Sequence, residues 1–151
     1  MSAAPTPASG ETLAQPLGNG VYLIDTHHVR PGLAAAHLVV DSGRAAFVDT
    51  GSGLAAPRLL AALEELGLAR EQVDYLFLTH VHLDHAGGAG QLMQALPNAR
   101  AVLHPRGAPH LVDPAKLIAG SIEVYGEAMF QQLYGELLPI PAERVHTVED
   151  G

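Results

Sequence analysis

Cysteine is absent from this 151-residue chain, and basic residues are few. Without cysteine the chain can form no disulfide and can offer no thiolate to a metal ion. One lysine and seven arginines stand against 16 acidic residues, which gives a formal net charge of −8. A chain this acidic has no basic stripe that could follow a phosphate backbone, so we expect no nucleic-acid partner.

Long apolar runs are also absent. No stretch approaches the roughly 18 apolar residues that a membrane-spanning helix needs. The first ten residues have neither a cationic start nor an apolar core, so they do not resemble a secretory signal. With 48% hydrophobic residues the chain can still bury a substantial core. We therefore expect a soluble globular domain with no membrane partner and, by default, a cytoplasmic location.

The pattern of apolar residues predicts an α/β fold in which helices cover a sheet. We expect a flexible tail at 1–19 and a folded region at 20–151, with an antiparallel start. The last predicted helix is expected to pack on the sheet, with a lid or substrate wall as the alternative. The expected strands lie at 21–24, 37–40, 45–48, 74–78, 101–103 and 145–148, and the expected helices at 54–66, 91–96 and 121–134.

The most informative segment is Thr79-His80-Val81-His82-Leu83-Asp84-His85. Imidazole nitrogen and carboxylate oxygen suit zinc and similar divalent ions, whereas calcium and magnesium prefer shells made of oxygen alone. Three histidines and one aspartate in seven residues therefore predict a metal site, with zinc or iron as the ion.

The spacing within this segment favours two metal positions. His80 and His82 project to one side of an extended chain, and Asp84 continues the same parity. His85 breaks it, so its ring can reach a second position as the chain turns after Asp84, which lies between the two positions or acts as a ligand. The apolar run 74–78 before the motif and the glycine-rich run 86–90 after it place the motif at the end of a strand.

Residues 79–88, T-H-V-H-L-D-H-A-G-G, resemble the H-x-H-x-D-H signature of the metallo-β-lactamase superfamily. Residues 45–51, A-A-F-V-D-T-G, resemble the strand and Asp-Thr-Gly turn that precede this signature in the superfamily. The resemblance runs from about residue 20 to about residue 103. It implies that His80 and His82 bind one metal, that Asp84 and His85 bind a second, and that Asp49 supports the ligands without binding metal itself.

The resemblance also implies an αββα sandwich made of two αβ halves, of which this chain is expected to hold the first. The second half of such proteins supplies a third histidine, a bridging aspartate and a final histidine, and none of these has a match here. A strand begins near Val145, and Glu149-Asp150-Gly151 resembles a turn with nothing after it. We expect weak metal binding by the half-site, an exposed apolar sheet face, and self-association or pairing with a C-terminal half.

The activity implied by the resemblance is hydrolysis. Two ions about 3.5–4 Å apart supply a hydroxide at neutral pH and polarise a carbonyl, and Asp84 would orient this nucleophile or move its proton. His85 directly after Asp84 resembles glyoxalase II-like thioesterases and lactonases, so a small-molecule thioester, lactone or other ester is the expected substrate. Two alternatives are an oxidoreductase like the persulfide dioxygenases, which use one iron, and a folding or assembly module without turnover.

Besides His37 in the strand predicted at 37–40, five other histidines stand outside any ligand pattern. His104, His110 and His146 are isolated, and His27 and His28 occupy a polar turn before Pro31. We expect all five to be surface or structural residues.

Overall fold

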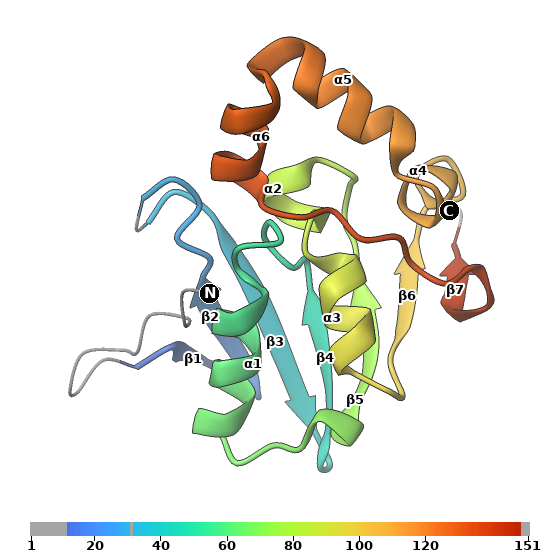
Figure 1. Cartoon of the computed structure of the whole chain (residues 1–151). Coiled ribbons are helices and arrows are strands. Elements are labelled where there is room, and N and C mark those ends of the chain that lie inside the picture. Colours follow the sequence, from blue (N-terminus) through green and yellow to red (C-terminus); the bar gives the residue numbers. More distant parts are fainter. Residues whose placement is uncertain (1–11, 31, 149–151) are drawn as a thin grey trace.

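A computed structural model describes residues 12–30 and 32–148 of the chain. They form a seven-stranded sheet whose spatial order, β1 to β7, is the order of the strands along the chain (Figure 1). The strands are β1 (Ala14–Gly18), β2 (Val21–Asp25), β3 (Ala35–Asp41), β4 (Arg44–Val48), β5 (Val73–Phe77), β6 (Arg100–Leu103) and β7 (Val145–Thr147).

The sheet changes from antiparallel to parallel at β4. Strands β1 to β4 pair antiparallel, as predicted, whereas β5, β6 and β7 each pair parallel with the strand before. Parallel neighbours require crossover connections, which helices provide. The connecting helices are α1 (Ala56–Glu65), the short η1 (Arg70–Gln72), α2 (Leu83–Ala86), α3 (Ala89–Ala95), α4 (Ala108–Val112), α5 (Ala115–Tyr125), α6 (Glu127–Tyr134) and the short η2 (Ala142–Arg144).

The core lies between one face of the sheet and helices α1 and α3 (Figure 1). Alternate strand residues such as Phe47 and Leu76 point into it and are fully buried. The residues between them point to the other face, where Tyr75 is 44% exposed and Phe77 is 39% exposed. Their rings stack with centroids 5.5 Å apart. An apolar face of the sheet is therefore accessible to solvent, as the sequence led us to expect.

The structure departs from the predicted elements in three places. The segment predicted as one helix at 121–134 is two helices, α5 and α6, because the chain breaks at Gly126 with φ 82° and ψ 157°. Helix α4 was not predicted. Strand β1 falls inside the segment predicted as a tail, so regular structure begins before residue 20. The predictions for residues 1–11 and for the turn at 149–151 lie outside the described residues.

Two arginines hold neighbouring elements together. Arg44 on β4 forms a hydrogen-bonded ion pair with Asp74 on β5, and the hydrogen bond lowers the pKa of Asp74 and raises that of Arg44. Arg144, just before β7, donates hydrogen bonds to the carbonyl oxygens of Met93 and Ala99, which flank the end of α3. In the described residues no helix is both long enough and apolar enough to cross a membrane.

Candidate metal centre

The loop after β4 positions the segment after β5. Asp49 follows β4 with φ 62°, a left-handed conformation that Asp and Asn adopt more readily than most residues. Its backbone N–H donates to the Phe77 carbonyl at 2.7 Å. Its carboxylate accepts the Thr79 backbone N–H at 2.9 Å and the Thr79 hydroxyl at 2.8 Å. Asp49 is only 8% exposed. Its hydrogen bonds therefore hold Thr79, the first residue of the motif, from the buried side of the loop.

Two further backbone hydrogen bonds hold the end of the motif. The Thr50 N–H donates to the His85 carbonyl at 2.7 Å, and the Gly88 N–H donates to the Gly51 carbonyl at 2.9 Å. A Cβ atom on Gly88 would lie 2.6 Å from the Ser52 carbonyl oxygen. Glycine at this position therefore allows the close approach of the two loops.

Helix α2 begins inside the motif. The chain runs without regular structure from 78 to 82, and the carbonyl of His82 accepts hydrogen bonds from the N–H groups of His85 and Ala86 at 2.9 and 2.8 Å. The turn thus starts at Leu83, one residue before Asp84. The prediction that Asp84 continues the extended parity of His80 and His82 is wrong, because helical geometry already applies at Asp84.

The four predicted ligands nevertheless form one cluster. The ring centroid of His80 lies 4.8 Å from that of His82 and 4.5 Å from that of His85. Asp84 Oδ2 is 3.4 Å from His85 Nε2, and Asp49 Oδ2 is 3.6 Å from His85 Nδ1. His80 and His82 are exposed, whereas Asp84 and His85 are half-buried. Asp49 lies behind the cluster.

A chain of hydrogen bonds fixes which nitrogen of His80 can bind a metal. The Asp49 carboxylate can only accept, so the Thr79 hydroxyl donates its proton to it. The Thr79 oxygen, 2.8 Å from His80 Nδ1, then accepts the proton of that nitrogen. The lone pair of His80 is consequently on Nε2, which is the arrangement usual for a histidine ligand. Thr79 acquires a role that the sequence pattern did not assign to it.

The donors fit a transition-metal ion in kind but not in number. Imidazole nitrogens beside a carboxylate suit zinc or iron. Within residues 12–30 and 32–148, however, no three His, Cys, Asp or Glu side chains are arranged around one point so as to hold an ion. The assignment of two ions to two pairs of ligands stays a prediction, and a complete shell needs donors from outside the described residues.

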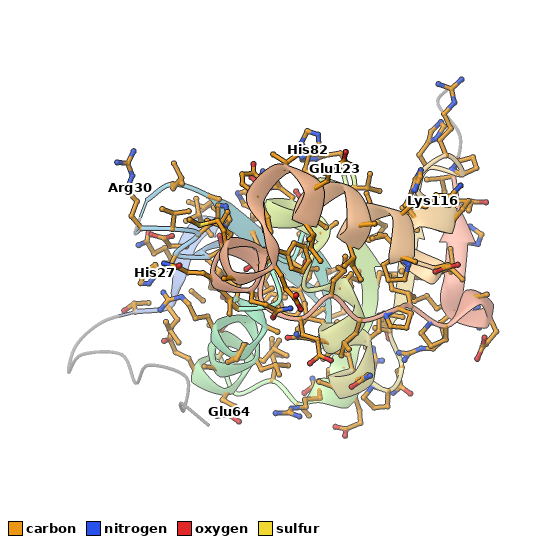
Figure 2. All side chains as sticks on the ribbon, turned by 45° about the horizontal axis from the view of Figure 1, so that its top comes forward. His27, Arg30, Glu64, His82, Lys116 and Glu123 are labelled. Atoms are coloured by element: carbon orange, nitrogen blue, oxygen red, sulfur yellow. The ribbon has the colours of Figure 1, made fainter. Side chains whose placement is uncertain are left out.

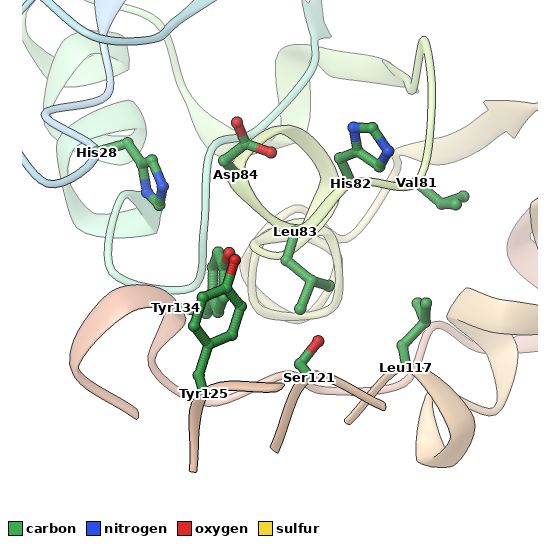
Figure 3. Close-up of a pocket in the computed structure, with 9 residues that line it drawn as sticks. All are labelled: His28, Val81, His82, Leu83, Asp84, Leu117, Ser121, Tyr125 and Tyr134. Atoms are coloured by element: carbon green, nitrogen blue, oxygen red, sulfur yellow. The ribbon is translucent and has the colours of Figure 1, made fainter. Parts of the chain in front are cut away.

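A cavity of about 380 Å³ opens beside the cluster (Figure 3). Its walls come from the β2–β3 loop, the motif and helices α5 and α6, so the helical segment expected to pack on the sheet forms a wall of this pocket instead. The lining residues are His28, Val81, His82, Leu83, Asp84, Leu117, Ser121, Tyr125 and Tyr134. His82 and Asp84 are thus the members of the cluster that line this cavity.

Tyr134 is the centre of an aromatic group in this pocket. Its ring lies 5.6 Å from that of His28, 6.1 Å from Tyr125 and 5.7 Å from Phe130, measured between centroids. Burial raises the pKa of Tyr134 to about 12, and the hydrogen bond with Tyr125 and the charge of Asp84 act in the same direction. Tyr134 therefore stays neutral at physiological pH.

Four of the five histidines predicted to be surface or structural residues lie away from this pocket. Figure 2 shows His27 at the outer side of its loop, and His110 and His146 are exposed, as expected. His104 accepts the Arg106 backbone N–H at 3.1 Å and shares a smaller cavity of about 220 Å³ with His80. His28, in contrast, lines the main pocket, and no local sequence signal separates it from His27.

Comparisons with known proteins agree with this arrangement. The family profile "Metallo-beta-lactamase superfamily" matches residues 29–150. The chain is 38% identical to hydroxyacylglutathione hydrolase of Salmonella paratyphi A over 94 residues, which are 60% of this chain and 34% of the relative. It is 33% identical to "Recombination protein 2" of Haemophilus influenzae over 99 residues, 62% of this chain and 12% of the relative.

Solved structures show the same fold. A subclass B3 metallo-β-lactamase from a soil metagenome matches with a TM-score of 0.60 and 24% identity, over 88% of this chain and 44% of that structure. The metallo-β-lactamase of Legionella gormanii matches with a TM-score of 0.59 and 17% identity, over 85% and 44%. The chain spans less than half of these structures and about a third of the hydroxyacylglutathione hydrolase. From its profile match, its fold and its His-x-His-x-Asp-His segment, the chain belongs to the metallo-β-lactamase superfamily.

Proposed function

We propose that this chain carries half of the active site of a metal-dependent hydrolase that acts on a thioester, lactone or other ester. The observation that carries the proposal is the cluster of His80, His82, Asp84 and His85, which opens on a pocket and is backed by Asp49. The similarity to a relative named for hydrolysing hydroxyacylglutathione supports the same reaction class.

Each residue of the cluster has a proposed task. His80 and His82 would hold one ion, and Asp84 and His85 would hold the other. Ions bound there lower the pKa of water and polarise a carbonyl group. Asp84 lines the pocket and is half-buried, so its carboxylate can also accept a proton from the attacking water. Asp49 keeps the motif in place through Thr79.

The remaining ligands and the cover of the sheet would come from a second αβ half. The chain spans 44% of the soil-metagenome structure that it matches, and Val39, Tyr75 and Phe77 leave apolar surface on the sheet face opposite α1 and α3. Burying such a face is favourable in proportion to its area. We infer that this face pairs either with a second half or with another copy of the chain.

The substrate is proposed to be a small molecule and not a nucleic acid. The formal net charge of −8 disfavours binding to phosphate backbones. A cavity of about 380 Å³ is at the lower end of the range for small-molecule sites.

The test is to assay the chain with two equivalents of zinc against panels of thioesters and lactones, alone and with a separate polypeptide that supplies the second half. We expect turnover only for the mixture, abolished by Asp84→Ala and retained by the control Asp41→Ala, which removes an exposed aspartate outside the pocket. Turnover by the chain alone would refute the half-site. Oxidation of a thiol-derived substrate with iron as the only metal would instead support the alternative, an oxidoreductase like the persulfide dioxygenases.

A further inference from the structure

His28 occupies an unusual position for a loop histidine. It follows β2 and contributes to the wall of the pocket, and Figure 3 places it across the pocket from His82, with Asp84 between them. Its ring stacks nearly parallel on Tyr134, with an interplanar angle of 17°. This stacking joins the β2–β3 loop to the end of α6 and holds the imidazole in one orientation.

The two ring nitrogens of His28 have different surroundings. Nδ1 is buried and makes no hydrogen bond within the described residues, and Nε2 is not among the buried unpaired atoms of that part of the chain. A buried N–H without a partner is costlier and rarer than an unpaired acceptor. The favoured tautomer therefore has its lone pair on Nδ1 and its proton on Nε2. The ring thus offers one hydrogen-bond donor to the pocket that it lines.

The other lining residues indicate which chemical group would meet this donor. Leu117, Tyr125 and Tyr134 form an apolar, partly aromatic part of the wall, and the polar side chains of His82, Asp84 and Ser121 form another part. No lysine or arginine is among the described residues that line it, and Asp84 supplies negative charge. As long as no metal ion is bound to Asp84, an anionic group in the pocket would face repulsion from this carboxylate without a cation to offset it. An uncharged group with a carbonyl acceptor for His28 and an apolar tail to lie against Leu117 and Tyr134 suits this pocket.

We propose that His28 is a substrate-positioning residue. Its Nε2–H donates a hydrogen bond to a carbonyl oxygen of an uncharged aryl or alkyl acyl group, which lies against Tyr134 and Leu117. The inference rests on the proposed hydrolase function and deepens it, because it names the group that the pocket accepts. It concerns substrate binding and not metal binding, so the two can be tested separately.

The experiment measures binding of small probes to the metal-free chain by NMR titration, so that neither metal nor turnover is needed. The probes are phenylacetamide, which is neutral and has a carbonyl, phenylacetate, which is anionic, and ethylbenzene, which has no acceptor. We expect phenylacetamide to bind at least about tenfold more tightly than phenylacetate, and its addition to shift the ¹⁵N signal of His28 Nε2.

Variants then separate hydrogen bonding from packing. His28→Phe keeps a ring on Tyr134 but removes the donor, so it should weaken phenylacetamide about 3- to 10-fold, the range for one net hydrogen bond. It should leave ethylbenzene unchanged. His28→Asn, which retains an N–H donor, should restore part of the loss. His146→Phe is the control, because His146 is an exposed histidine on β7 and is not among the residues that line the pocket, and this variant should bind all probes as the unmodified chain does.

Each contrary result would overturn the proposal. Equal binding of phenylacetamide to the chain and to a folded His28→Phe variant would show that His28 only packs. Equal or tighter binding of phenylacetate would refute the preference for uncharged groups, and failure of every probe to bind would show that the pocket takes no such ligand. Failure of the hydrolase proposal would leave these titrations intact and would be seen only in the metal and turnover assays.

Discussion

Replacing Asp49 with asparagine tests the support beneath the metal cluster. The side chain keeps its size, and asparagine tolerates φ 62° as well as aspartate does, so the backbone should not change. The hydrogen bonds from the Thr79 N–H and hydroxyl lose their charge assistance. Hydrogen bonds to charged groups contribute about 1 kcal/mol more than neutral ones. We expect Asp49→Asn to lower the free energy of unfolding by about 1–2 kcal/mol, which corresponds to a fall in Tm of about 2–8 °C for a chain of this size.

The same substitution should disturb metal binding through His80. An asparagine N–H directed at the Thr79 oxygen frees the Thr79 hydroxyl to donate to His80 Nδ1, so the lone pair of His80 is no longer fixed on Nε2. Losses of supporting groups of this kind typically reduce metal affinity about 10–100-fold. The ¹⁵N spectrum of His80 should change from a single tautomer to a mixture.

The assays are thermal denaturation by circular dichroism, zinc titration against a chelator and ¹⁵N NMR of the histidine rings. Asp41→Asn is the matched control, since it makes the same chemical change at the exposed end of β3 and should alter none of the three measurements. If Asp49→Asn has the Tm, the zinc affinity and the His80 tautomer of the unmodified chain, Asp49 is an ordinary turn residue and the relay through Thr79 has no function.

Three further predictions follow from the site. His82→Ala should remove most of the zinc or iron that the chain retains, measured by elemental analysis; the exposed His110→Ala should not, and equal metal in both would contradict the ligand assignment. Because the pKa of Tyr134 is raised from 10.0 to about 12, its stabilising contribution should persist below pH 10 and disappear as pH rises through 12. A tyrosine absorbance titration should show a late step that Tyr134→Phe removes, and a late step that survives would refute the shift. Gly88→Ala should lower the free energy of unfolding by about 1–3 kcal/mol through overpacking. Gly120→Ala, in an open helical position, should raise it by about 0.5–1 kcal/mol. If denaturant unfolding gave changes of the same sign for both variants, the loops around Gly88 would have to relax.

The sequence allowed the fold and the metal motif to be predicted where the information is local. Strand β5 was placed to within one residue, because an apolar run between turn signals is enough to define a buried strand. The candidate ligands lie within six residues of one another, so their clustering depends on one turn of chain. The helical start at Leu83 was missed because Leu83-Asp84-His85 has no capping residue: His82 provides only its carbonyl.

Long-range contacts explain what could not be predicted. Apolar residues continue across Gly126, and one glycine weakens a helical pattern only by about 1 kcal/mol, so nothing local required the break between α5 and α6. The carbonyl of Tyr134 accepts a hydrogen bond from the Gly53 N–H, which holds α6 against a distant loop. Strand β1 contains Pro16, which is tolerated because β1 is an edge strand. His28 reaches the pocket only through the pairing of β2 with β3.

The agreement between strand order and chain order has a consequence for how this molecule folds during synthesis. Every strand pairs with the strand made immediately before it, so no pairing waits for a distant segment and each loop closure spans a single hairpin or crossover. A nascent chain that has emerged as far as β4 already contains a complete antiparallel unit, and β5 joins it as soon as α1 folds back. We expect the unit of β1 to β4 to be formed before the histidines leave the ribosome, and the loop that carries Asp49 to be completed only when Phe77, Thr79 and His85 supply its hydrogen-bond partners.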